Sequence, residues 1–233
     1  MRILNAVKTL WKISIFKTII FNFNYFPFKT AIIFPVIVYN NVILKKMNGK
    51  IVLTDPHITG SIKLGYKFYD FLTSNDKLIW LQNGGVVELG NYVVFGQGLF
   101  VKLKQKGFLK IGSNTNIPGG KNSKIISSIG IYIGNNCRFS WDVRIIDTSF
   151  HYLINKETGE RNNIKGIITI GNNNWIGANS KIYKNTRTAN FSTFGANSIL
   201  TRDYTGEEYN VWVGNPPRII KRGWYRCLLF TDS

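Results

Sequence analysis

Apolar residues recur every six positions through the second half of the chain, with small or turn-forming residues between them. The longest series is Ile170, Ile176, Ile182, Thr188, Phe194 and Leu200. A helix would require a spacing of about 3.6 residues, and an amphipathic strand would alternate over a longer run. Spacing by six with Gly and Asn in between predicts short strands joined by tight turns, because Gly and Asn tolerate the left-handed backbone conformation.

A triplet of an aliphatic residue, glycine and a polar residue sets the length of one coil. The triplet begins at Leu64, Leu89, Ile111, Ile133 and Ile170. The middle three are 22 residues apart, whereas the last step is 37 residues, which is one repeat plus a 15-residue insertion. Each coil is therefore expected to contain a few six-residue units, with one long interruption before the last triplet.

Stacked coils of this length pair as parallel strands about 4.8 Å apart, so each inward apolar residue lies on its equivalent in the next coil. One coil cannot bury its apolar side alone, and stability therefore requires neighbours. We expect an all-β fold, a parallel β-helix. A β-sandwich is the alternative, but it does not predict a 22-residue register.

The pattern divides the chain into successive regions. Residues 1–50 are expected to form a basic helix and an extended segment, residues 51–203 the β-helix, and residues 204–233 a C-terminal tail. Residues 148–166 coincide with the insertion and are expected to leave the coils as a loop excursion.

The charge is strongly positive. Thirty Lys and Arg against twelve Asp and Glu give a net charge of +18, which favours phosphorylated ligands, an anionic membrane surface or nucleic acid. No nucleic-acid-binding motif accompanies the charge, so we do not expect a nucleic-acid partner. Residues 1–50 contain eight basic and no acidic residues, and their apolar runs are shorter than the roughly 20 residues of a membrane-spanning helix. This segment either packs against the main domain or lies on an anionic membrane face.

Cysteine usage suits a reducing compartment. Cys137 and Cys227 lie far apart and form no CxxC pattern, so neither a disulfide framework nor a zinc site is supported. No secretory signal is convincing. We expect a cytoplasmic protein without a bound metal.

Three stretches resemble the hexapeptide-repeat acyltransferases, which fold as left-handed parallel β-helices. They are Ile170–Ala178, Phe194–Asp203 and Gly214–Lys221, and the resemblance covers about residues 85–222. The upstream stretch Ser140–His151 is similar to the branch that acetylates sugars in capsule and lipopolysaccharide synthesis. That branch commonly has Asp-Thr-Asp-Phe-His, and in this chain Ser149 takes the place of the second Asp.

His151 is the candidate general base. Acyl transfer to a hydroxyl needs a group that removes the proton during attack on the thioester, and imidazole, with an ordinary pKa of about 6.5, suits this task. Asp147 is expected to orient His151 or to stabilise its charged form, although it also suits a turn that ends a coil. His57, the other histidine, lies beside a proline outside the repeat and is expected to be structural.

The resemblance also implies binding residues. Coenzyme A would lie along a groove between coils, with Gly177, Ala178 and Ala196 leaving room for its pantetheine arm and Trp175 shaping the groove. Thr201, Arg202 and Arg218 would meet its nucleotide and phosphate groups, for which cationic side chains are suited. Trp141, Asp142 and Ser149 would line the acceptor pocket. The alternative for the small residues is that tight turns alone require them.

These observations predict an acetyl-CoA-dependent O-acetyltransferase that acts on a sugar hydroxyl in capsule or lipopolysaccharide biosynthesis. The acceptor would be a sugar, a nucleotide-sugar or a lipid-linked glycan. The enzyme would be a cytoplasmic homotrimer, and peripheral contact with the inner membrane face through the basic N-terminal segment stays open. An amino-sugar N-acyltransferase and a non-catalytic β-helix scaffold are the alternatives.

Overall fold

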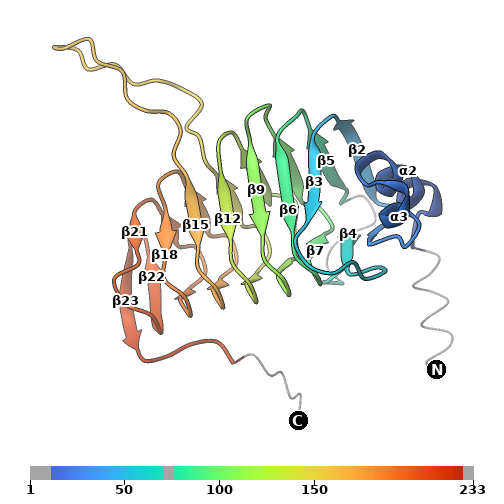
Figure 1. Ribbon diagram of the computed structural model, residues 1–233. Helices are drawn as coiled ribbons and strands as arrows, with labels where there is room; N and C mark the ends of the chain where they lie inside the picture. The colour runs from blue at the N-terminus through green and yellow to red at the C-terminus, as the bar shows by residue number, and fades with distance from the viewer. Residues whose placement is uncertain (1–11, 71–75, 228–233) are drawn as a thin grey trace.

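The computed structural model describes residues 12–70 and 76–227, and it confirms the parallel β-helix. Successive strands fall in turn on three sheets, which form the sides of a prism (Figure 1). Sheet I contains β1 (Val36–Val38), β4 (Ile62–Tyr66), β7 (Val94–Gly96), β10 (Asn116–Ile117), β13 (Arg138–Phe139), β16 (Trp175–Ile176), β19 (Thr193–Phe194), β22 (Asn210–Gly214) and β23 (Pro217–Arg222). Every pair in it is parallel except β22 with β23, which form an antiparallel hairpin.

Sheets II and III complete each coil. Sheet II contains β2 (Val42–Met47), β5 (Leu78–Gln82), β8 (Phe100–Leu103), β11 (Lys124–Ser127), β14 (Arg144–Ile146), β17 (Lys181–Tyr183) and β20 (Ile199–Leu200). Sheet III contains β3 (Lys50–Leu53), β6 (Val86–Leu89), β9 (Phe108–Ile111), β12 (Ile131–Ile133), β15 (Ile168–Ile170), β18 (Arg187–Thr188) and β21 (Asp203–Tyr204). We name the turns between the sheets the I/II, II/III and III/I edges.

The glycine triplets form the III/I edge. The polar residue of each triplet links neighbouring coils: the Ser113 N–H donates to the Asn135 side chain at 2.8 Å, and the Asn135 N–H donates to the Asn172 side chain at 2.8 Å. The next residue takes the left-handed conformation, as at Asn136 (φ 57°) and Asn173 (φ 59°). The triplet is thus a turn that also pairs with the coil above and the coil below.

Two features differ from the sequence pattern. The first coil begins at Val36, well before residue 51. The turn after its third strand begins Leu53-Thr54-Asp55 and lacks the glycine of the triplets. The triplet at Leu64 does not form a III/I turn, because Leu64 and Gly65 lie within β4 of sheet I.

A helix covers the first coil. Helix α2 (Ile15–Tyr25) begins at Ser14, whose hydroxyl accepts a hydrogen bond from the Lys17 N–H, and the short α3 (Phe28–Ala31) follows. The buried side of α2 is partly polar: the Asn22 amide donates to the Val36 carbonyl at 2.7 Å and accepts from its N–H at 3.2 Å. Phe21 adds an edge-on ring contact with the buried Trp80, with centroids 5.8 Å apart. Within residues 12–70 and 76–227, no helix is long and apolar enough to cross a membrane.

Candidate active site

His151 lies on an excursion that leaves the II/III edge between β14 and β15. The excursion projects away from the prism as a long hairpin (Figure 1). Bridges between Thr148 and Lys165 and between Ile154 and Arg161 hold its two arms together. His151 is exposed to solvent, and in the described part of the chain its imidazole makes no hydrogen bond. The ring is accessible to a substrate and needs no partner to be displaced.

Ser149 stabilises the base of this excursion. Its N–H donates to the Ile164 carbonyl at 2.8 Å, and its hydroxyl contacts the carbonyls of Ile164 and His151 at 3.3 and 3.4 Å. The Ser149 side chain therefore bonds to the backbone on both arms.

Asp147 is fully buried where the excursion leaves the coil. Its carboxylate accepts hydrogen bonds from the backbone N–H groups of Ser128–Gly130 at 2.8 to 2.9 Å and from the Ser127 hydroxyl at 3.3 Å. The backbone carbonyl of Asp147 accepts from the Gly166 N–H at 3.0 Å, which joins the two ends of the excursion where they meet the coil. These bonds join Asp147 to the preceding coil, so its role toward His151 stays a prediction, and its observed contacts are those of a positioning residue.

A second group of candidate residues meets on the I/II edge. Trp141, Ala178 and Ala196 stand one above another in consecutive coils, as the pairing of Phe139 with Ile176 and of Ile176 with Phe194 requires. The Trp141 carbonyl accepts from the Asn179 N–H at 2.9 Å, and the Ala178 carbonyl accepts from the Asn197 N–H at 2.8 Å. Side chains continue the ladder, because the Asn179 amide donates to the Asn197 side-chain oxygen at 2.6 Å.

Of the small residues on this edge, Gly177 is required by the stacking itself. A Cβ on Gly177 would lie 2.5 Å from the backbone nitrogen of Ala196. Ala178 is half-buried and Ala196 is exposed, so these two present small side chains to solvent along the edge. The fold therefore explains Gly177, whereas the two alanines leave open space that a ligand can occupy.

Aromatic residues flank this edge. Trp175 on β16 is exposed, and its indole N–H contacts the Ser140 hydroxyl at 3.4 Å. Trp141 meets Tyr69 edge-on, with centroids 5.4 Å apart. Asp142 has φ 57° and accepts from the Asn122 N–H at 2.9 Å, so its carboxylate supports the turn of the preceding coil. Sequence reasoning missed Tyr69, because nothing local relates it to a residue so distant along the chain.

The cationic candidates lie at the C-terminal end of the prism. Thr201 and Arg202 follow β20, and the Arg202 guanidinium donates to the Pro217 carbonyl at 3.3 Å. Arg218, the next residue on β23, is exposed. The hydrogen bond therefore brings Arg202 close to the strand that carries Arg218.

The sequence and the fold were compared with known proteins. No family model matches the chain, and no curated protein matches it in sequence. Among solved structures, the polySia-specific acetyltransferase NeuO matches with a TM-score of 0.55 and 19% identity, over 82% of this chain and 91% of that chain. A likeness at this identity establishes the fold.

The chain folds as a left-handed parallel β-helix. Weaker matches include the polysialic acid O-acetyltransferase OatWY, with a TM-score of 0.44 and 21% identity over 83% of this chain and 91% of that chain. The N-acyltransferase AntD from Bacillus cereus, solved with dTDP and 3-hydroxybutyryl-CoA, has a TM-score of 0.43 and 19% identity over 80% of this chain and 79% of that chain.

The left-handed β-helix separates the candidate residues into two places. The excursion with His151 leaves the II/III edge, whereas Trp141, Ala178 and Ala196 lie on the I/II edge, across the width of sheet II. One chain therefore does not bring the candidate base to the candidate groove. His57 is exposed in the turn after β3, and it lies far in sequence from the candidate residues on either edge. Within the described ranges, no group of three or more His, Cys, Asp or Glu residues is placed to hold a metal.

The contacts of Asp147 predict how the excursion is anchored. Replacing Asp147→Asn removes an acceptor from a site with several buried N–H donors, which typically costs about 1–3 kcal/mol. We expect faster tryptic cleavage at Lys156 and Arg161 in the native protein, followed by gel electrophoresis. Glu157→Gln, the same chemical change at an exposed position in the excursion, is the control and should leave the cleavage rate unchanged. Equal cleavage rates in the two variants would contradict the anchoring role.

Proposed function

We propose that the chain is an acetyl-CoA-dependent O-acetyltransferase that acts on a sugar hydroxyl in the biosynthesis of a surface polysaccharide. The observation that carries the proposal is that the chain has both a solvent-accessible His151 on an excursion and, on another edge, small residues along the coils. The fold shared with NeuO, a polySia-specific acetyltransferase, supports it. The acceptor would be a sugar, a nucleotide-sugar or a lipid-linked glycan.

In the proposed reaction, the unprotonated nitrogen of His151 accepts the proton of the acceptor hydroxyl while the oxygen of that hydroxyl attacks the thioester carbonyl. The tetrahedral intermediate then expels the coenzyme A thiolate, which takes the proton back from the imidazolium. Asp147 holds the base of the excursion, and Ser149 joins its arms, so both act by positioning His151. Ala178 and Ala196 leave room for the pantetheine arm, and Arg202 and Arg218 offer cations for the phosphates.

An amino-sugar N-acyltransferase is the second candidate function. It uses the same groups, because an amine attacks the thioester in the same way once a base has taken its proton. AntD is an N-acyltransferase, but the match to it is too weak to decide between the two acceptors. A non-catalytic scaffold would need neither His151 nor a thioester. It would release no thiol from acetyl-CoA with any acceptor, which distinguishes it from both acyltransferases.

Removing the base is expected to stop acyl transfer without weakening the binding of acetyl-CoA. We expect His151→Ala to lower turnover by about 10²- to 10⁴-fold, the usual contribution of a general base, and to leave acetyl-CoA affinity unchanged. Thiol release from acetyl-CoA is followed against hydroxyl and amino sugars, free and nucleotide-linked. The matched control is His57→Ala, which replaces the other histidine and should keep full turnover. Normal turnover in His151→Ala would refute the assignment, and an amine-only response would select the N-acyltransferase.

We infer that the working enzyme is a homotrimer. A ring of three chains brings the II/III edge of one against the I/II edge of the next, which places His151 beside the neighbour's groove. The excursion supports this, because Leu153 is 72% exposed and Ile154 is 60% exposed, and clusters of exposed apolar side chains are typical of protein interfaces.

Replacing the exposed apolar residues near the tip of the excursion by serine is expected to weaken the trimer. Sedimentation velocity should give three times the 26.6 kDa chain mass for the natural protein and a shift toward one chain for Leu153→Ser/Ile154→Ser, with acyl transfer lost in parallel. Ile58→Ser, at another exposed apolar position, is the control and should stay trimeric. A natural protein that is monomeric and fully active would contradict the trimer.

We infer that α2 rests on an anionic membrane surface. The buried side of the helix is partly polar, because Thr18 and Asn22 lie there beside Phe21. Its other side is an apolar face in which Ile15 is 74% and Phe16 is 73% exposed. Ile19, Ile20 and Phe23 continue this face. The first acidic residue of the chain is Asp55, so the surroundings are basic and suit anionic headgroups.

Removing the apolar face is expected to release the protein from vesicles. We expect Phe16→Ser/Ile19→Ser to lower co-sedimentation with vesicles of anionic phospholipid at least several-fold, because apolar burial in the lipid boundary is lost. Neutral vesicles should bind the natural protein weakly. Val213→Ser/Ile220→Ser, at exposed apolar positions on the C-terminal hairpin, is the control and should bind as the natural protein does. Equal binding by all three proteins would rule out this contact.

A further inference from the structure

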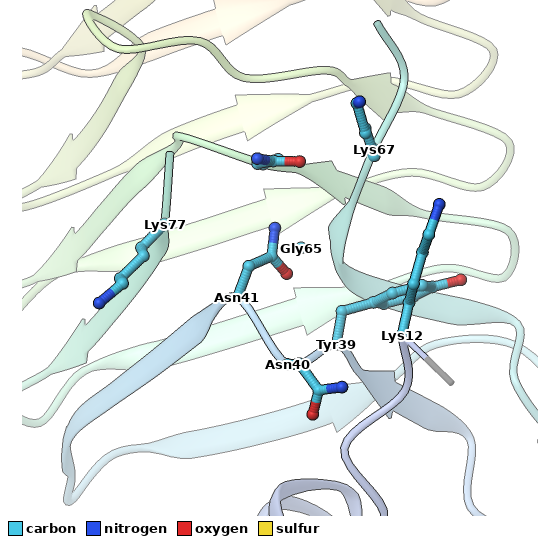
Figure 2. A pocket seen from close by; sticks show the side chains of 8 residues that line it. Lys12, Tyr39, Asn40, Asn41, Gly65, Lys67 and Lys77 are labelled. Carbon is cyan, nitrogen blue, oxygen red and sulfur yellow. The ribbon is translucent and has the colours of Figure 1, made fainter. Parts of the chain in front are cut away.

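A cavity of about 440 Å³ lies at the N-terminal end of the I/II edge, where no candidate residue was expected. It is lined by Lys12, Tyr39, Asn40, Asn41, Gly65, Lys67, Lys77 and Gln97. These residues come from the segment before α2, from the turn after β1, from β4 and its flank, from the start of β5 and from the turn after β7. Figure 2 shows Lys12 and Lys67 on one side of Asn41, with Lys77 on the other.

The lining is basic. Three lysines and no acidic residue line the cavity, so it carries three formal positive charges. Lys67 has one acidic neighbour, Asp70 at 3.6 Å, but that carboxylate is fully exposed, and salt screens such pairs strongly. The buried Asp76 precedes Lys77 in sequence but does not line the cavity.

A fourth lysine reinforces the charge from behind the turn. The Lys17 ammonium donates to the carbonyls of Asn40 and Val42 at 2.8 and 2.6 Å. Burial lowers the pKa of Lys17, and the positive charge of Lys77 lowers it further, which indicates that the two ammonium groups lie near each other. A phosphate group bound here would relieve this repulsion.

The shape of the cavity depends on Gly65, the residue whose triplet departs from the repeat. It has φ 88°, and a Cβ there would lie 2.5 Å from the Asn41 side-chain oxygen and 2.6 Å from the Val42 side chain. The amide side chain of Asn41 adds N–H donors beside the ammonium groups. Ammonium and amide donors around a hollow are the groups that phosphate oxygens require.

The cavity lies on the same edge as Trp141 of the proposed acceptor site. Along the I/II edge, the Gln97 carbonyl accepts from the Gly120 N–H at 3.0 Å, and the Gly119 carbonyl accepts from the Asp142 N–H at 3.1 Å. Gln97 and Trp141 are therefore two coils apart, or about 10 Å at the usual spacing between paired strands.

Aromatic rings follow the same path. Tyr66 contacts Phe68 with centroids 5.0 Å apart, Phe68 contacts Tyr69 at 6.3 Å, and Tyr69 contacts Trp141 at 5.4 Å. Rings of this kind suit the apolar face of a sugar that extends from a phosphate anchor toward the acyl donor.

We propose that this cavity binds the diphosphate group of an activated sugar acceptor, with Lys12, Lys67 and Lys77 as its cations. The proposal rests on the proposed function for the identity of the sugar, whereas the binding of diphosphate does not depend on it. The diphosphate belongs either to a nucleotide-sugar or to a lipid-linked sugar. The cavity fixes this end of the acceptor, and the sugar lies along Tyr69 and Trp141.

The test is calorimetric titration of the full chain with inorganic pyrophosphate. We expect Lys12→Gln/Lys77→Gln to lower the affinity at least tenfold. The control Lys106→Gln/Lys156→Gln removes the same charge at exposed positions outside the cavity and should change the affinity less than twofold. No binding by the natural protein, or equal losses in the two variants, would overturn the proposal.

Two further arms separate this cavity from the coenzyme A groove. Arg218→Gln should weaken acetyl-CoA binding and leave pyrophosphate binding unchanged, and the double lysine variant should do the reverse. If both ligands weaken together in both variants, the cavity is not a separate site and the proposal fails. His151→Ala should keep pyrophosphate affinity. If the natural protein shows no acyl transfer but binds pyrophosphate in a lysine-dependent way, the proposed function is refuted and this site stands.

Competition identifies the source of the diphosphate. Uridine diphosphate and a short prenyl diphosphate in detergent are each titrated against bound pyrophosphate. Displacement by the nucleotide indicates a nucleotide-sugar acceptor, and displacement by the prenyl compound indicates a lipid-linked one. If neither displaces pyrophosphate, the cavity does not accept an esterified diphosphate and the proposal is overturned.

Discussion

The register between successive coils is the constraint on which the rest of the molecule depends. On sheet II, Ile125 pairs with Ile145, Ile145 with Ile182, and Ile182 with Leu200, and all four are buried. A strand that gained one residue would turn its whole apolar set outward. Insertions are therefore tolerated only where the chain turns, and the long excursion that carries His151 leaves from such a turn. The position of the candidate base thus follows from the packing of the core.

The same constraint separates the parts of the proposed site. Side chains on one edge repeat along the prism axis, as Trp141, Ala178 and Ala196 do, but residues on different edges are held apart by the width of a sheet. A catalytic arrangement built on such a scaffold must either fit on one edge or combine edges of different chains. The exposed apolar tip of the excursion favours the second solution.

Much of the fold was predictable because its information is local. The turn that follows each glycine triplet needs left-handed residues such as Asn136 and Asn173, and these appear in the sequence at the spacing of the coil. The first coil escaped this reasoning, because α2 stabilises it with long-range contacts such as Asn22 to Val36. The partners of Asp147 were also beyond reach, since they belong to the preceding coil. The basic cavity joins Lys12 to Lys77 and Gln97, which no local pattern relates.

A stack of parallel strands has no natural end. The backbone groups that each inner coil pairs with its neighbour are left unpaired on the outer side of the last coil. At the first coil, Thr18 and Asn22 of α2 use their side chains to occupy the groups that β1 would otherwise offer to another strand. At the last coil, β23 turns back antiparallel on β22 and presents Arg218 and Arg222 outward. Unprotected edges of this kind lead to fibre-like association between molecules. The buried polar side chains of α2 and the reversed strand are therefore the two devices that make this repeat a discrete molecule rather than a growing filament.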